Sequence, residues 1–165
     1  MMTEQSDIGA RLQRIEDTKA IREVKARYFR YMDTREWSGM PDVFTDDAVM
    51  DMSEEQATFD RMGLTTGGAM LVTRGRDTIV ANMERSLVGT RTMHHGHMPE
   101  IEFVSRDEAK GIWPMEDIVE LPEGAPVRRL HGYGHYHETY VRGSDGRWRI
   151  AHLRLSRLLV EFDPA

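Results

Sequence analysis

The second half of the chain holds four long segments of extended character separated by short turns, and this pattern restricts the fold more than any other feature. The segments cover residues 92–105, 109–120, 127–142 and 147–162. The last two are joined by Gly143-Ser144-Asp145-Gly146, which contains the Asp-Gly pair typical of hairpin turns. Consecutive strands with such short connections predict an antiparallel meander, and their length predicts a strongly curved sheet.

The first half of the chain has the apolar spacing of helices. Apolar side chains recur at steps of three and four from Ile8 to Tyr31, which predicts a long amphipathic helix that ends near Asp33. The other expected elements are a short helix that carries Trp37, Met40 and Phe44, strands at 48–52 and 71–73, and a helix at 78–87.

Helices that precede a β meander indicate an α+β fold in which the helices cover one face of the sheet. The expected architecture is a cone-shaped barrel: a strongly curved, mixed or antiparallel sheet closed by the N-terminal helices, with a cavity that suits a small apolar ligand. The chain has 165 residues, so we expect one domain over 8–165 after a disordered tail at 1–7. Residues 53–70 show no clear period and predict a long loop, which is either a lid over the cavity or a mobile insertion.

Composition excludes several classes of protein. The chain has no cysteine, which excludes a disulfide scaffold, a thiol nucleophile and a Cys-ligated metal site. The formal net charge of −6 argues against a nucleic-acid partner. No apolar run approaches the roughly 20 residues of a membrane span, and residues 1–7 lack the apolar core of a signal peptide. We therefore expect a cytoplasmic protein with no membrane partner.

Histidine is the strongest chemical signal. All seven lie after residue 90, on the predicted sheet: His94, His95, His97, His131, His135, His137 and His152. Alternate residues of a strand share a face, so His94 is expected to face away from His95. Three interpretations remain open: one histidine is a general base, His135 and His137 join a third histidine on zinc or iron, or all are structural.

Asp33, at the end of the first predicted helix, is the second signal. It is expected either to cap the next helix, with Glu36 completing a capping box, or to point into the cone and orient a histidine. In the second role the carboxylate would fix the imidazole tautomer and stabilise the imidazolium. Tyr28 and Tyr31, on the same helix, either offer a hydroxyl to a substrate or pack in the core.

Further residues are candidates for substrate contacts. Met98 and Trp113 are expected to line the cavity. A buried Arg157 would need an anionic partner, which a substrate carboxylate would supply; an exposed Arg157 on an outer strand is the alternative. The sequence has no glycine-rich phosphate loop, no GxSxG and no HExxH, so we expect acid–base chemistry without a metal or other cofactor.

Three stretches of the sequence carry a family resemblance. They are residues 20–48, with Tyr28-Phe29-Arg30-Tyr31-Met32-Asp33; residues 93–117, with Met93-His94-His95-Gly96-His97; and Gly146-Arg147-Trp148-Arg149-Ile150. Together they resemble the SnoaL-like branch of the nuclear transport factor 2-like superfamily, and the second is similar to bile-acid 7α-dehydratase-like members. The resemblance, which extends to scytalone dehydratase-like enzymes, implies a cone-shaped barrel with an Asp–His dyad. The dyad falls here on Asp33 and His94.

The resemblance implies a cofactor-independent lyase or isomerase, dehydratase-like, that acts on a small polycyclic or aromatic molecule in a hydrophobic cavity. His94 would be the base, Asp33 its partner and Tyr28 an assisting group. The expected substrate contacts are Tyr31, Met98, Trp113, His135 and Arg157. The alternatives are a non-catalytic ligand-binding or assembly module of the same fold, and a His₃ metalloenzyme.

A homo-oligomer is also expected. The last predicted strand carries Leu153, Leu155, Leu159 and Phe162, which is more apolar surface than one cavity needs. The resemblance favours a trimer over a dimer.

Overall fold

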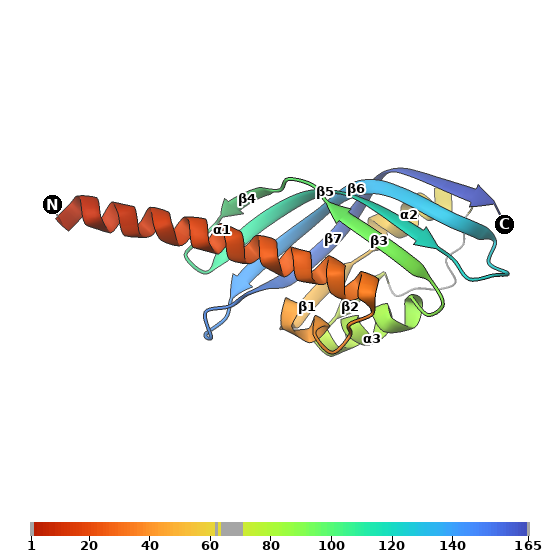
Figure 1. The fold of residues 1–165 in the computed structure, drawn as a ribbon, viewed down its shortest axis with the longest axis horizontal. Helices are drawn as coiled ribbons and strands as arrows, with labels where there is room; N and C mark the ends of the chain where they lie inside the picture. Colours follow the sequence, from red (N-terminus) through yellow and green to blue (C-terminus); the bar gives the residue numbers. More distant parts are fainter. Residues whose placement is uncertain (1, 62, 64–70, 165) are drawn as a thin grey trace.

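The computed structural model describes residues 2–61, 63 and 71–164, and it has the α+β architecture that the sequence predicts (Figure 1). Its helical elements are α1 (Met2–Thr34), the 3₁₀ turn η1 (Met40–Val43), α2 (Ser53–Arg61) and α3 (Arg76–Ser86). Its strands are β1 (Phe44–Asp51), β2 (Val72–Arg74), β3 (Arg91–Gly96), β4 (Glu100–Phe103), β5 (Glu108–Glu120), β6 (Val127–Arg142) and β7 (Trp148–Pro164).

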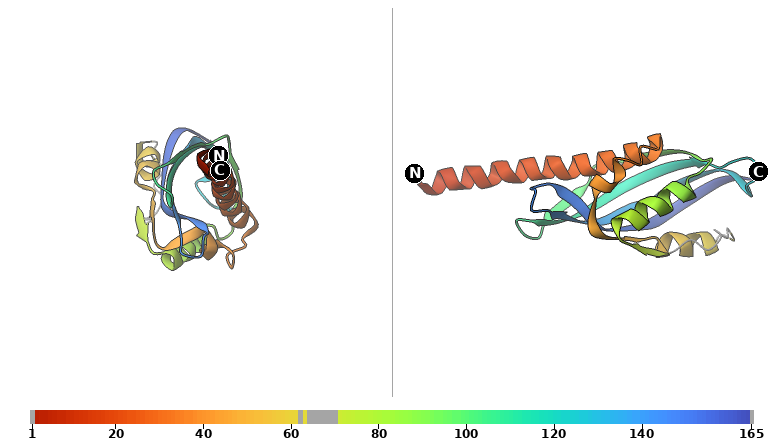
Figure 2. Two further views of the ribbon diagram at one scale, coloured as in Figure 1. Left: turned by 90° about the vertical axis from the view of Figure 1, so that its left-hand side faces the viewer. Right: turned by 90° about the horizontal axis from the view of Figure 1, so that it is seen from below.

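The strands form one curved sheet in the order β2-β1-β7-β6-β5-β3, and β4 also pairs with β5. β1 runs parallel to β7, whereas the β1–β2, β3–β5, β4–β5, β5–β6 and β6–β7 pairs are antiparallel. The sheet curves around α1, which lies along its concave side (Figure 2). The architecture is therefore the curved sheet closed by the N-terminal helix that the residue pattern predicts.

The alternation of side chains along β6 separates the two faces of the sheet. Tyr136, Glu138 and Tyr140 are buried on the concave face, and His135 and His137 point to the outer face. The same period of two runs through β5, as expected for a strand with one face against a core, and through β7 with interruptions where its register to β6 shifts.

Two polar clamps attach α1 to the sheet. Near the start of the packed part of α1, Asp17 accepts hydrogen bonds from Trp148 Nε1, at 3.0 Å, and from Arg142. Two turns later, Lys25 Nζ lies 2.5 Å from Glu138 Oε1, and both side chains are buried. These two sets of contacts fix the position of α1 along its own axis relative to the sheet.

The N-terminal part of α1 extends past the sheet (Figure 1). Apolar residues in the first half of the helix are exposed: Ile8 by 63%, Leu12 by 54% and Ile15 by 68%. The helix begins at Met2, so residues 2–7, which we expected as a disordered tail, continue the helix. Within the described ranges, no helix is both long and apolar enough to cross a membrane.

Three predicted elements differ from the structure. The strand expected at 92–105 is two strands, β3 and β4, interrupted before Glu100 by Pro99, which has no N–H for a ladder bond. The second helix is only the turn η1, because β1 already begins at Phe44. The loop expected at 53–70 begins instead with α2; residues 62 and 64–70 lie outside the described part.

The apolar residues of β7 are mainly buried in the first half of the strand and mainly exposed towards its end. Leu153 and Leu155 are fully buried in the core, so they are not the surplus surface that we expected. Leu158, Leu159 and Phe162, towards the end of the strand, are exposed by 73%, 52% and 37%.

Candidate functional site

The last turn of α1 brings Asp33 against β3. Asp33 Oδ1 lies 2.6 Å from His94 Nδ1, and Oδ2 accepts a hydrogen bond from the His94 backbone N–H at 2.8 Å. Thr92, on the same face of β3, donates its hydroxyl to Oδ1 at 2.9 Å. Asp33 lies inside α1, and Glu36 pairs with Arg30, so the capping-box interpretation of Asp33 and Glu36 is wrong.

These donors determine the charge state of Asp33. Burial acts to raise its pKa, but the hydrogen bonds from the His94 ring, the His94 backbone and Thr92 outweigh that effect and hold the pKa of Asp33 below its ordinary value. Asp33 is therefore a carboxylate at neutral pH. A carboxylate at Nδ1 favours the tautomer with the proton on Nδ1 and leaves Nε2 as the basic atom of His94.

The free nitrogen of His94 faces a second carboxylate. Nε2 lies 3.9 Å from Asp117 Oδ2, beyond hydrogen-bond distance, and His94 and Asp117 are paired across β3 and β5. Phe29 of α1 stacks on the imidazole with 5.9 Å between ring centres. His94 is thus enclosed by two carboxylates and an aromatic ring, and its side chain is only 7% exposed.

Asp117 belongs to an ion-pair cluster with Arg157 of β7 and Glu55 of α2. Arg157 Nη1 and Nη2 donate to the two oxygens of Asp117 at 2.8 and 2.7 Å, and Arg157 Nε donates to Glu55 at 3.0 Å. Burial opposes the charge of Arg157, but the two carboxylates outweigh it and keep its pKa above the ordinary value. Gly132 makes room for the cluster, because a Cβ there would lie 2.3 Å from Arg157 Nη1.

Two tyrosines of the core, Tyr28 on α1 and Tyr136 on β6, are also buried. Tyr28 and Tyr136 pack edge to face with 5.9 Å between ring centres, and Lys25 Nζ lies 3.4 Å from the centre of the Tyr136 ring. Burial raises the pKa of both hydroxyls well above the ordinary value, with Glu138 adding to the shift at Tyr28. Both keep their protons at neutral pH and are donors rather than bases.

The structure separates the other predicted substrate contacts. Trp113 is buried in the core, and Tyr31 is half-buried and packs over Gly39. Met98 is 83% exposed on the connection between β3 and β4. His135 lies on the outer face of the sheet, opposite to His94.

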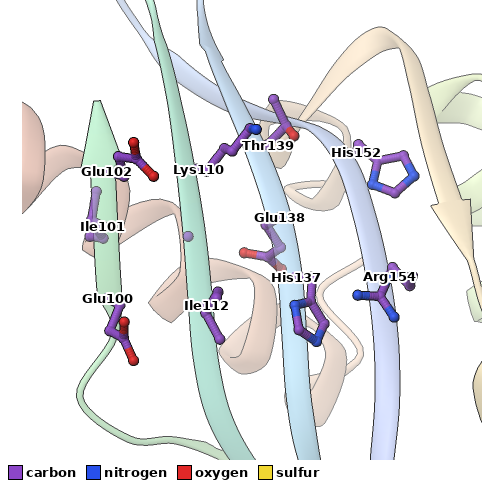
Figure 3. A pocket seen from close by; sticks show the side chains of 11 residues that line it. Glu100, Ile101, Glu102, Lys110, Ile112, His137, Glu138, Thr139, His152 and Arg154 are labelled. Carbon is purple, nitrogen blue, oxygen red and sulfur yellow. The ribbon is translucent and has the colours of Figure 1, made fainter. Parts of the chain in front are cut away.

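The outer face carries most of the histidines. His131 contacts Glu116 at 3.1 Å, His137 contacts Ser156 at 3.1 Å, and His152 lies on the neighbouring strand. Across β4 to β7 this face has a hollow of about 430 Å³ beside His137, His152 and Arg154 (Figure 3). Within the described residues, no group of three or more His, Asp or Glu side chains is arranged to hold a metal ion.

Sequence reasoning missed Asp117, Glu55 and Tyr136. Asp117 faces inward in an otherwise apolar alternation along β5, and that position was a signal for a buried, paired carboxylate. Glu55 gave no such signal, because α2 has no buried side chain to set a helical period. The anionic partners of the buried Arg157 are the carboxylates of Asp117 and Glu55 rather than a substrate carboxylate.

Comparisons with known proteins find relatives along most of the chain. The sequence profile of the SnoaL-like domain matches residues 13–154. A protein of Gibberella zeae, named probable cyclase FGR4, is 25% identical over 138 residues, which cover 84% of this chain and 89% of that protein.

Two solved structures share the fold. A hexachlorocyclohexane dehydrochlorinase (LinA) type 2 has a TM-score of 0.74 at 21% identity, with 92% of this chain and 91% of that chain covered. A putative scytalone dehydratase of Novosphingobium aromaticivorans has a TM-score of 0.72 at 20% identity, with 92% and 95% covered.

Proposed function

The chain belongs to the SnoaL-like domain family, and from this premise we propose that it is a cofactor-independent enzyme of the lyase or isomerase type. The observation that carries the proposal is the 2.6 Å contact between Asp33 and His94 Nδ1, which leaves Nε2 as a base on the concave side of the sheet. The names of the relatives, a cyclase, a dehydrochlorinase and a dehydratase, support chemistry of this class.

In the proposed reaction, His94 Nε2 removes a proton from a carbon next to a carbonyl or conjugated group. The Asp33 carboxylate stabilises the imidazolium that forms. Tyr28 polarises the carbonyl or donates a hydrogen bond to the leaving hydroxyl. In a dehydration the electron pair of the C–H bond forms the double bond, and the hydroxyl leaves as water with the proton carried by His94. In an isomerisation His94 returns the proton to another carbon.

We propose a small polycyclic or aromatic molecule as the substrate. The Phe29 ring stacks on His94, and the Tyr136 ring packs against Phe29 with 5.8 Å between ring centres; these rings favour an apolar, planar partner. Acid–base catalysis of this kind contributes roughly 10²–10⁴-fold to the rate.

The test is turnover of a panel of hydroxylated polycyclic and aromatic compounds by wild type and three variants. We expect His94→Ala and Asp33→Asn each to lose at least about a hundredfold in kcat while keeping the wild-type circular dichroism. His135→Ala, a histidine of the outer face, is the matched control and should retain activity. Wild-type turnover by His94→Ala would refute the mechanism.

One observation favours the second candidate, a binding module without chemistry. His94 Nε2 faces the Asp117 carboxylate, and the imidazole is nearly buried. A module of this kind would bind an apolar ligand with equal affinity in wild type and Asp33→Asn, and would convert no compound of the panel.

A further inference from the structure

Arg157 has no N–H left for a ligand. Its Nε and one N–H of Nη2 go to Glu55 Oε1, and the other N–H of Nη2 goes to Asp117 Oδ2. The two N–H groups of Nη1 go to Asp117 Oδ1 and to the sulfur of Met115, at 2.8 and 3.8 Å. The five donors of the guanidinium are thus used within the chain, and the side chain is 4% exposed.

The carboxylates outnumber the cations around His94. Asp33 and Asp117 lie on the two sides of the imidazole, and Glu55 follows behind Arg157. Counted over the three carboxylates, Arg157 and His94, the group carries an excess of one negative charge even when His94 is protonated. The next guanidinium, that of Arg35, contacts Asp33 only through the hydroxyl of Thr92. An anionic ligand would be repelled there, whereas a neutral or cationic ligand would not.

The two carboxylates differ in how firmly they are held. Asp117 lies within β5, is 3% exposed and binds Arg157 through both oxygens. Glu55 lies on α2, which buries no side chain, and its own side chain is 15% exposed. The neighbouring Glu54 pairs with Arg154, but this pair is solvent-exposed and contributes little. If Glu55 were removed, Asp117 would still hold Arg157 in place. The N–H groups of Arg157 that now bind Glu55, on Nε and Nη2, would then be unpaired.

We propose that Glu55 is a specificity-determining residue: it occupies the position on Arg157 that a substrate carboxylate would take, and so restricts the site to neutral or cationic molecules. The proposal rests on the proposed location of the site beside His94, but not on the reaction. Glu55 acts as a built-in carboxylate that competes with any anionic ligand for the same guanidinium.

The test uses benzoate and benzyl alcohol, an anionic and a neutral molecule of similar size and shape. Their Kd values are measured by calorimetry with wild type, Glu55→Ala, Glu55→Gln and Glu54→Ala. The ring signals of His94, followed by NMR, report whether the ligand lies in the site. Glu54→Ala is the matched control, because it removes a carboxylate from the same helix turn without touching Arg157.

We expect benzoate to bind Glu55→Ala about tenfold or more tightly than wild type, with shifts of the His94 signals. Glu55→Gln should show part of this gain, and Glu54→Ala none. The Kd of benzyl alcohol should stay within about twofold in all four proteins. Equal benzoate affinity in wild type and Glu55→Ala, or no benzoate binding to either, would overturn the proposal. Neither result depends on turnover, so failure of the reaction mechanism leaves this test intact.

Discussion

At the scale of single residues, the site depends on how Asp33 is held. Three donors converge on its carboxylate: the His94 ring, the His94 backbone and the Thr92 hydroxyl. Arg35, in the left-handed region with φ of 60°, donates in turn to Thr92 and to the Thr90 carbonyl. These bonds of Arg35 attach the end of α1 to residues 90–92 and so keep the Asp33 carboxylate beside β3.

The lowered pKa of Asp33 gives an acid-stability prediction. Because the pKa in the folded state lies below the unfolded value of ~3.9, Asp33 stabilises the fold above pH ~4, and this contribution is lost as the pH falls through the folded pKa. We expect a loss of roughly 1 kcal/mol, reduced by solvent screening, between pH 6 and pH 3. Urea unfolding of wild type should include this loss, and the loss of Asp33→Asn between the same two pH values should be smaller by that amount. The exposed Asp47→Asn should behave as wild type; if it matches Asp33→Asn, the assignment fails.

At the scale of elements, the position of α1 depends on the Lys25–Glu138 pair. Lys25 Nζ is surrounded by the rings of Tyr28, Phe29 and Tyr136, and Glu138 also accepts the Tyr140 hydroxyl. Burial lowers the pKa of Lys25 to about 8, against the opposing effect of Glu138. Breaking such a pair on one side costs ~3–5 kcal/mol, because a buried charge is left alone.

The same pKa predicts that the protein becomes more stable on mild alkalinisation. Between pH 8 and pH ~10.4 the unfolded chain keeps a proton on Lys25 that the folded chain has lost, so the free energy of unfolding rises, by about 1–3 kcal/mol. Above pH ~10 the buried tyrosines reverse the trend, because their raised pKa values hold protons in the folded state. Urea midpoints at pH 7 and 9.5 should show the rise. The double variant Lys25→Met/Glu138→Gln, which leaves no unpaired charge, should lack it; an unchanged rise there would contradict the assignment to Lys25.

The elements differ in how far the sequence predicts them. The alternation of β6 and the hairpin residues before β7 predict those strands closely, because one buried face imposes a period of two. α2 has no buried face and hence no period to recognise. Within the site, Asp33 and His94 could be predicted from the family resemblance of the motifs that contain them. The Arg157 cluster was not, because the register of β5, β6 and β7 decides which side chains meet.

At the scale of the whole molecule, the exposed apolar side chains include three near the end of β7. We propose self-association through Leu158, Leu159 and Phe162, with a trimer as the expected species. Sedimentation velocity should show an oligomer for wild type and a monomer for Leu158→Asp. Leu12→Asp, which alters an equally apolar but distant site on α1, should leave the oligomer intact. Dissociation by Leu12→Asp alone would place the interface on the helix instead.

The ion pairs of the site each join residues that are distant in the chain. Asp33 and His94 are 61 residues apart, Asp117 and Arg157 are 40, and Glu55 and Arg157 are 102. Contacts over such separations form only after long loops have closed, which is the slow part of folding. A collapsed intermediate in which β7 has not yet paired therefore has no Arg157 cluster, however much helix and hairpin it contains. In a refolding experiment, ligand binding should return in a single late phase with the pairing of β7, after the helical signal has recovered.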